Sequence, residues 1–336
     1  MSEHEPAIEA LQADGAVYPP SGPVAANAVV NDPGIFERAA ADPVAWWEEQ
    51  ARHLEWSAPW TRALVDDDAP FYRWFESGTL NVAANCLDRH LAERGDRVAF
   101  HWEGEPGDRV SVTYRELHQR VCRTANALRA LGVTRGGRVA IYMGMVLELP
   151  IAMLACARIG AAHTVVFGGF SADALRSRMV DFGATVLVTQ DEGWRAGKTI
   201  PLKANADAAL DGAPGVRHSL VCRRTGGEVA WHAGRDMWFH EAEAAADAHC
   251  PAEPMDSEQM LFALYTSGTT GAPKGIVHTS GGYLTGAAAT HRMVFDLHDD
   301  DIYWCAADIG WVTGHSYIVY GPLANGATSV MYEGNP

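Results

Sequence analysis

Apolar and polar positions along the middle of the chain predict strands that alternate with helices. Short apolar runs that predict buried strands occur at residues 97–102, 138–143, 163–167 and 185–189. Apolar side chains recur every three or four positions, which predicts helices, over residues 81–94, 114–131, 146–158 and 171–182. This alternation predicts an α/β fold, with βαβ units in a mostly parallel and covered sheet.

The pattern continues towards the C-terminus. Further strands are expected at residues 110–113, 219–222, 261–264, 302–305 and 327–332, and further helices at residues 238–248 and 282–295. The sequence stops at Pro336, just after the last predicted strand. A βαβ protein that stops there lacks its next covering helix, so we expect the chain to be the truncated N-terminal part of a larger protein.

The composition of the sequence divides the chain into three predicted regions. Residues 1–30 are rich in Ala, Pro and Gly without periodicity, and predict a mobile leader. Residues 31–80 predict an appended N-terminal extension, in which Asp42 and Pro43 read as an N-cap and first helical position. Its tryptophans could form a binding surface, but packing onto a larger domain is the favoured interpretation. Residues 81–336 predict the large domain.

The net charge and the N-terminal sequence limit the partners and the cellular location that can be expected. The 42 acidic and 26 basic residues give a formal net charge of −16, which argues against nucleic acid as a partner. The N-terminus lacks the basic and apolar regions of a signal peptide, and six scattered cysteines predict reduced thiols, so a cytoplasmic protein is expected. Residues 149–167 are apolar but carry Arg158 and His163, and predict a helix followed by a strand rather than a membrane span.

The segment richest in chemistry is residues 265–275, with the sequence YTSGTTGAPKG, directly after the predicted strand 261–264. Glycines let backbone amides approach a phosphate, hydroxyls donate hydrogen bonds, and Lys274 supplies a positive charge. An ordinary polar turn is the alternative, and the length of the match argues against it. The segment is not a Walker A motif, because no Gly-Lys-Ser/Thr follows, which excludes a P-loop kinase or ATPase. A Rossmann dehydrogenase is excluded by the missing Gly-x-Gly-x-x-Gly.

This segment resembles the phosphate loop of the adenylate-forming enzymes, which include acyl-CoA synthetases, luciferases and peptide-synthetase adenylation domains. The resemblance implies that Thr266 and Lys274 act in catalysis. It also implies contacts to the ATP phosphates from Thr266, Ser267, Gly268, Thr269, Thr270, Gly271 and Lys274.

Three further stretches resemble the acetyl-CoA synthetase branch of that superfamily: residues 167–171 (FGGFS), 191–198 (DEGWRAGK) and 304–317 (WCAADIGWVTGHSY). Read alone, they would be a turn at a helix start, a solvated pair of cations and a piece of core. The resemblance instead implies a coenzyme A site formed by Phe167, Gly168, Gly169, Arg195, Lys198 and Thr313. It also implies an acyl pocket formed by Trp311, Val312 and Thr313. His278 and His315 are interpreted as structural histidines rather than catalytic bases.

The resemblance implies an AMP-forming acetate–CoA ligase that uses ATP, Mg²⁺, acetate and coenzyme A and forms an acetyl-adenylate. In the family, the adenine contacts, a metal-binding glutamate and a small C-terminal domain with an assisting lysine come after the motifs matched here, so we expect this chain to be inactive alone. No metal ligand is assigned within it. A propionyl-CoA synthetase and a non-catalytic nucleotide-binding or coenzyme A-binding fragment are the alternatives. The resemblance favours acetate over propionate, because the propionyl branch often has valine where this chain has Thr313 after Val312. Oligomeric state does not follow from the sequence.

Overall fold

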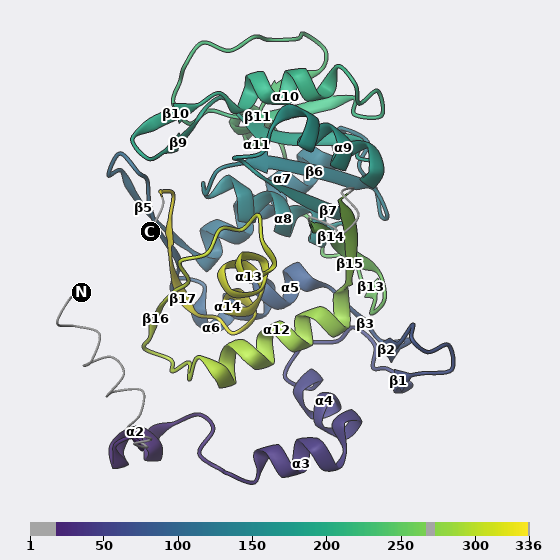
Figure 1. Ribbon diagram of the computed structural model, residues 1–336, viewed down its shortest axis with the longest axis vertical. Helices are drawn as coiled ribbons and strands as arrows, with labels where there is room; N and C mark the ends of the chain where they lie inside the picture. Colours follow the sequence, from purple (N-terminus) through teal and green to yellow (C-terminus); the bar gives the residue numbers. More distant parts are fainter. Residues whose placement is uncertain (1–17, 267–272, 335–336) are drawn as a thin grey trace, which may run out of the picture.

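The computed structural model describes residues 18–266 and 273–334 and confirms the α/β fold class. Its largest sheet has seven strands in the order β12-β11-β8-β6-β7-β14-β15. These strands are β6 (Arg138–Met143), β7 (Ala162–Phe167), β8 (Val186–Gln190), β11 (His218–Cys222), β12 (Asp236–Trp238), β14 (Met260–Thr266) and β15 (Lys274–Thr279). Strands β11, β6, β7, β14 and β15 of this sheet are labelled in Figure 1. Neighbouring strands are parallel except β14 and β15, which form an antiparallel hairpin.

The chain reverses its direction of travel across this sheet at β6. The next strand along the chain, β7, pairs with one side of β6, and β8 pairs with the other side. In open α/β sheets, ligands bind beyond the carboxyl ends of the strands at such a switch point. The carboxyl ends of β6, β7, β8 and β14 lie at one edge of the sheet because these strands run parallel. A binding site is therefore expected at this edge.

Helices cover both faces of the sheet. On one face, α9 (Ala172–Phe182) and α10 (Leu202–Leu210) share a core cluster with apolar side chains of β6 and β8. The helices α7 (Tyr114–Ala130) and α8 (Glu148–Arg158) cover the other face. Every residue of α8 from Leu149 to Arg158 is buried. The helix α11 (Phe239–Ala245) packs beside α7.

A second sheet of four strands has the order β16-β17-β4-β5. Its strands are β4 (Val98–Glu103), β5 (Arg109–Thr113), β16 (Ile302–Trp304) and β17 (Thr328–Tyr332). Phe100 of β4, Leu154 of α8 and Ile141 of β6 belong to one buried cluster, so α8 forms part of a core shared by the two sheets. Burial of apolar surface in this core stabilises the folded state by about 25 cal/mol per Å².

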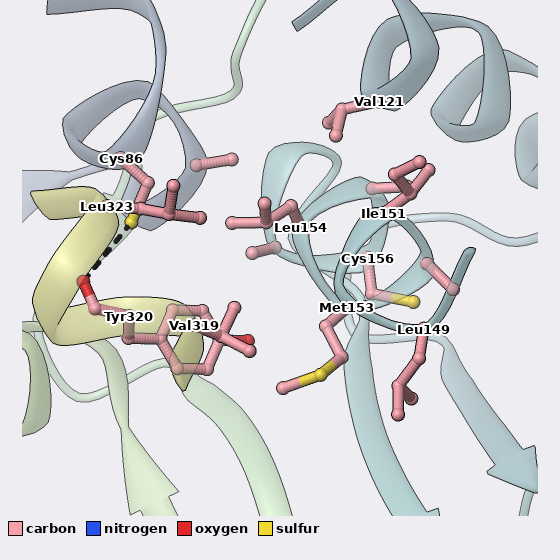
Figure 2. Close-up of a cluster of buried hydrophobic side chains, with 14 of the residues drawn as sticks. Cys86, Val121, Leu149, Ile151, Met153, Leu154, Cys156, Val319, Tyr320 and Leu323 are labelled. Carbon is pink, nitrogen blue, oxygen red and sulfur yellow. Dashed lines mark hydrogen bonds between the residues drawn. The ribbon is translucent and has the colours of Figure 1, made fainter. Parts of the chain in front are cut away.

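The candidate acyl segment lies on one continuous helical stretch whose centre is wider than an α-helix. It consists of α13 (Val312–Gly314), the π-helical turn η2 (His315–Tyr320) and α14 (Gly321–Ala324). Figure 2 shows Val319, Tyr320 and Leu323 of this stretch packed opposite α8, and the Cys86 thiol lies 3.8 Å from the Tyr320 carbonyl oxygen. Turns of π-helix occur often at functional sites.

Arg158 and His163, in the apolar stretch 149–167, are paired with other side chains inside the protein, which agrees with the prediction of a helix followed by a strand. The Arg158 guanidinium donates to both carboxylate oxygens of Asp88 at 2.7 and 2.9 Å. A hydrogen bond of 2.6 Å joins His163 Nε2 and the Tyr320 hydroxyl. Across the described residues, no helix is long and apolar enough to span a membrane.

The N-terminal part packs through its aromatic side chains. It contains α2 (Gly22–Asn27), α3 (Ile35–Ala41), α4 (Pro43–Ala51) and the hairpin of β1 (Arg62–Val65) and β2 (Arg73–Glu76). Trp56, Trp60 and Trp74 surround the buried ring of Phe75 at centroid distances of 5.0–5.7 Å. Asp42 caps α4 as predicted, by accepting a hydrogen bond from the Ala45 amide at 3.0 Å.

Several boundaries differ from the sequence prediction. The helix predicted over residues 81–94 is divided into α5 (Val82–Cys86), the 3₁₀ turn η1 (Asp88–His90) and α6 (Leu91–Arg94). Leu87 leaves the helical region with φ −129°, and the turn after it places Asp88 against Arg158. Elements not predicted include α2, the hairpin β1–β2, β9 (Gly193–Arg195), β10 (Lys198–Ile200), α10, β12, and the pair β3 (Thr79–Leu80) and β13 (Met255–Asp256). The remaining helix is α12 (Ser280–Val294), close to the predicted 282–295.

Candidate functional site at the carboxyl edge of the sheet

The two candidate catalytic residues face each other across a hairpin. Thr266 ends β14, Lys274 begins β15, and their Cα atoms are partners in the antiparallel register. Both residues are exposed, so they are available to a ligand. The predicted phosphate contacts at Ser267, Gly268, Thr269, Thr270 and Gly271 lie outside the described residues.

The start of this hairpin loop is tied to helix α9. The Tyr265 hydroxyl donates a hydrogen bond of 2.6 Å to Asp181, near the end of α9. Burial and the neighbouring Asp181 carboxylate raise the pKa of Tyr265, so the phenol keeps its proton. The Arg178 guanidinium lies 5.7 Å from the Tyr265 ring and 4.7 Å from the Phe170 ring. The candidate phosphate segment is therefore connected to the Gly168–Gly169 turn that precedes α9.

A cavity of about 150 Å³ brings together residues from three of the candidate stretches. Phe167 from the end of β7 packs against Trp311 with ring centroids 5.9 Å apart. The Arg195 guanidinium from β9 lies 4.8 Å above the Phe167 ring, a cation–π contact. The other lining residues are Met145, Trp304, Cys305, Ala306, Ala307, Asp308, Tyr332 and Gly334.

Arg195 and Lys198 flank a tight hairpin turn. β9 and β10 pair antiparallel, with Arg195 opposite Lys198. Between them, Ala196 and Gly197 have φ values of 50° and 73°. Two central residues with positive φ are typical of a type I′ turn, which matches the twist of a two-residue hairpin. Lys198 is exposed and does not line the cavity.

The remaining predicted residues of the coenzyme A site and the acyl pocket do not line the cavity. Gly168 stands where a Cβ atom would lie 3.2 Å from the Met143 carbonyl oxygen, so the turn approaches β6 closely. Gly169 precedes the α9 N-cap Ser171, which accepts a hydrogen bond from the Ala174 amide at 3.4 Å. Val312 and Thr313 are exposed at the start of α13. Of the three predicted acyl-pocket residues, only Trp311 contributes to the cavity wall.

Asp308 is a cavity residue that the sequence analysis did not single out, although it lies inside the motif 304–317. Its Oδ1 accepts a hydrogen bond from the Gly310 amide at 2.7 Å. Burial raises the pKa of Asp308, while the Gly310 amide and the charge of Arg195 act in the opposite direction. An acidic group thus stands in the same cavity as the candidate cation Arg195.

Both histidines interpreted as structural lie in one aromatic cluster around Phe262 of β14. The ring of His315 lies 4.6 Å from the Phe262 ring, and the ring of His278 lies 4.5 Å from it. His315 is fully buried, and burial lowers its pKa to about 4. Burial also lowers the pKa of His278. Both imidazoles are therefore neutral at pH 7.

Comparison with known proteins decides the family. The model of AMP-binding enzymes matches residues 87–336, and the model of the acetyl-coenzyme A synthetase N-terminus matches residues 34–86. Acetyl-coenzyme A synthetase 2 of Pseudomonas putida is 56% identical over 304 residues, which are 90% of this chain and 47% of that protein. The chain belongs to the acetyl-coenzyme A synthetase family.

Two other members of the acetyl-coenzyme A synthetase family give the same picture. The synthetase of Streptomyces avermitilis is 56% identical over 321 residues, 95% of this chain and 49% of its own. The synthetase of Aeromonas salmonicida is 52% identical over 332 residues, 96% of this chain and 51% of its own. The chain thus spans about half the length of the curated relatives it matches. Among its described residues, no group of three or more His, Cys, Asp or Glu side chains is arranged to hold a metal ion.

Proposed function

We propose that this chain is the part of an AMP-forming acetate–CoA ligase that holds the ATP phosphates and begins the coenzyme A site. The observation that carries the proposal is the convergence at one sheet edge. There, the Thr266–Lys274 pair ends β14 and begins β15, while Phe167, Arg195 and Trp311 meet around one cavity. An edge with a switch point is where α/β proteins bind nucleotides, and the relatives bear the name acetyl-coenzyme A synthetase.

In the proposed first step, a carboxylate oxygen of acetate attacks the α-phosphorus of ATP. The bond from that phosphorus to the bridging oxygen breaks, and pyrophosphate leaves with the electron pair. This in-line displacement depends on charge stabilisation at the phosphates more than on acid–base chemistry. Lys274 supplies a cation and Thr266 a hydroxyl donor to the β- and γ-phosphates. Mg²⁺ bound to the substrate ATP would neutralise part of the phosphate charge.

In the proposed second step, the coenzyme A thiolate attacks the acetyl carbonyl carbon and AMP leaves with its phosphate oxygen. Arg195 and Lys198 would bind the nucleotide end of coenzyme A, since both present charged donors to phosphate. Phe167 and Trp311 would line the path of its uncharged arm with apolar surface. Val312 and Thr313 would border the acetyl group beside Trp311.

Acetate-dependent exchange between ATP and labelled pyrophosphate tests the first step. We expect the chain alone to bind ATP without exchange, and a chimera completed with the second half of the Streptomyces avermitilis synthetase to exchange. Exchange with propionate but not acetate would favour a propionyl-CoA synthetase. A well-folded chimera that binds ATP but exchanges with neither acid would favour a non-catalytic binding role. Exchange by the chain alone would contradict the expected inactivity.

A further inference from the structure

The hairpin that carries Arg195 has few attachments to the two large sheets. β9 and β10 pair only with each other among the described strands. A hairpin of two three-residue strands is marginal by itself. The position of Arg195 over Phe167 must therefore depend on contacts at the base and at the tip of this hairpin.

At the base, Asp191 holds the chain between β8 and β9. Its side chain is buried, Oδ1 accepts from the Arg224 amide at 2.8 Å, and Oδ2 accepts from the Gly226 amide at 2.8 Å. These bonds join the start of the hairpin to the segment that follows β11. They lie at the end of the hairpin away from its turn.

At the tip, the carboxylate of Glu105 binds the turn itself. Glu105 lies between β4 and β5, 91 residues before Ala196. Its Oε2 accepts from the Ala196 amide at 3.1 Å, and its Oε1 accepts from the Gly197 amide. Two consecutive amides that converge on one anion form a nest, a backbone arrangement that favours negative charge. The contact also offsets the cost of a positive φ at Ala196, a residue with a Cβ atom.

Glu105 is held by a buried ion pair. Its amide donates to Glu333 Oε2 at 3.0 Å, and the Glu333 side chain is only 1% exposed. The Arg224 guanidinium donates to Glu333 Oε1 at 2.7 Å and to Oε2 at 2.6 Å, and it also binds Asp108 at 2.9 and 3.0 Å. The tip of the hairpin is thus fixed to the loop after β4 and to the end of β17.

Charge explains why an acid is suited to this position. Arg195 and Lys198 stand directly opposite each other in the hairpin register. Like charges opposite each other on paired strands destabilise the pair. Neither cation forms an ion pair within 4 Å among the described residues. The Glu105 carboxylate, which accepts from the Ala196 and Gly197 amides, places a negative charge at the turn between them.

We propose that Glu105 is a positioning residue for the coenzyme A site. It clamps the Ala196–Gly197 turn so that Arg195 stays over Phe167 at the cavity, while contacting no substrate itself. The inference rests on the proposed function of Arg195 and Lys198 in binding the phosphates of coenzyme A.

A double-mutant cycle on the whole chain tests this role. Affinity for coenzyme A would be measured by calorimetry in Glu105→Ala, in Arg195→Ala and in the double variant. We expect Glu105→Ala to weaken binding about tenfold in the unsubstituted background and less than twofold in the Arg195→Ala background. Glu105→Gln, which keeps one acceptor oxygen, should be intermediate. Glu103→Gln is the matched control, because the Glu103 side chain pairs with Arg109 within the β4–β5 hairpin. This substitution should leave the affinity for coenzyme A unchanged.

Hydrogen exchange of residues 193–200, followed by mass spectrometry, tests the clamp without any ligand. Protection in the unsubstituted chain that is lost in Glu105→Ala is the expected result. Equal exchange in both overturns the clamp. If coenzyme A binds and the losses of affinity in the two single variants add up in the double variant, the positioning role is overturned. A residue that only stabilises the fold would act independently of Arg195. No binding by the unsubstituted, folded chain overturns the coenzyme A site, and the role of Glu105 with it.

Discussion

Thr266 and Lys274 are paired residues at the open end of the β14–β15 hairpin, with their Cα atoms opposite each other. Seven residues separate them in sequence, yet the register places a hydroxyl and an ammonium group at the same level of the sheet edge. Both side chains are exposed, so neither is committed to the core. Because both side chains are exposed, their contributions to ligand binding can be measured separately from their contributions to the stability of the fold.

Lys274→Ala should weaken ATP binding 10–100-fold, because a charge-assisted hydrogen bond contributes roughly 1.5–3 kcal/mol. Its effect on the free energy of unfolding should be below about 0.5 kcal/mol, since the side chain is exposed. Calorimetric titration with MgATP measures the first quantity and urea denaturation the second. Lys198→Ala is the control, an exposed lysine of the other hairpin that should weaken coenzyme A binding alone. Equal loss of ATP affinity in both variants would mean a general charge effect.

Gly314→Ala should destabilise the protein by roughly 3 kcal/mol. A Cβ atom there would lie 2.3 Å from the Asp308 carbonyl oxygen and 2.5 Å from Ile309 Cα, and backbone atoms cannot move aside cheaply. Gly286→Ala is the matched control in helix α12, where a Cβ atom meets nothing within 4 Å. It should stabilise the protein by about 0.5–1 kcal/mol, because glycine is a poor helix former. Urea denaturation of both variants checks the contrast, and a neutral Gly314→Ala would show that the turn rearranges freely.

Hydrophobic periodicity was sufficient to predict β6, β7, β8, β11 and β14 of the large sheet and its covering helices α7, α8, α9 and α11, but not β12 or α10. The strand 138–143 and the N-cap at Asp42 were confirmed, since both depend on local sequence alone. The division of the helix at Leu87 was not predictable in the same way. It depends on the buried Arg158, which is 70 residues away from Asp88 in sequence and must be neutralised.

The site was predictable only in its individual stretches. Resemblance identified Phe167, Arg195 and Trp311 separately, but no local pattern shows that their side chains meet at one cavity. The hairpin β9–β10 was missed because three-residue strands carry too little periodicity. Glu105 was missed because its contact with the turn at Ala196 follows from how the two sheets pack.

Stability should fall as the pH drops from 7.5 to 5. Burial lowers the pKa of His315 to about 4 and that of His291 to about 4, whereas histidine in an unfolded chain titrates near 6.5. Below that pH the unfolded state takes up protons that the folded state does not, which costs about 2 kcal/mol per histidine by pH 5.

Substitution identifies the groups that cause this pH dependence. Urea denaturation of His315→Gln at pH 7.5 and pH 5 should show a loss of stability smaller by about 2 kcal/mol than in the unsubstituted chain. His249→Gln, at an exposed position, should leave the loss unchanged. An equal pH dependence in all three proteins would show that His315 is protonated in the folded state.

Asp308→Asn should make the protein more stable at pH 7. Burial raises the pKa of the Asp308 carboxyl in the folded state, so the folded protein binds its proton more tightly than the unfolded chain does. Stability is therefore lost as the pH rises above the unfolded value of about 3.9 and through the folded pKa. Asparagine removes this loss and keeps an oxygen that accepts the hydrogen bond from the Gly310 amide. Urea denaturation at pH 7 and pH 4 should show a gain at pH 7 that shrinks at pH 4, with the exposed Asp300→Asn as control. A loss of stability at pH 7 would instead mean that the Arg195 charge outweighs burial and that the cavity favours the carboxylate.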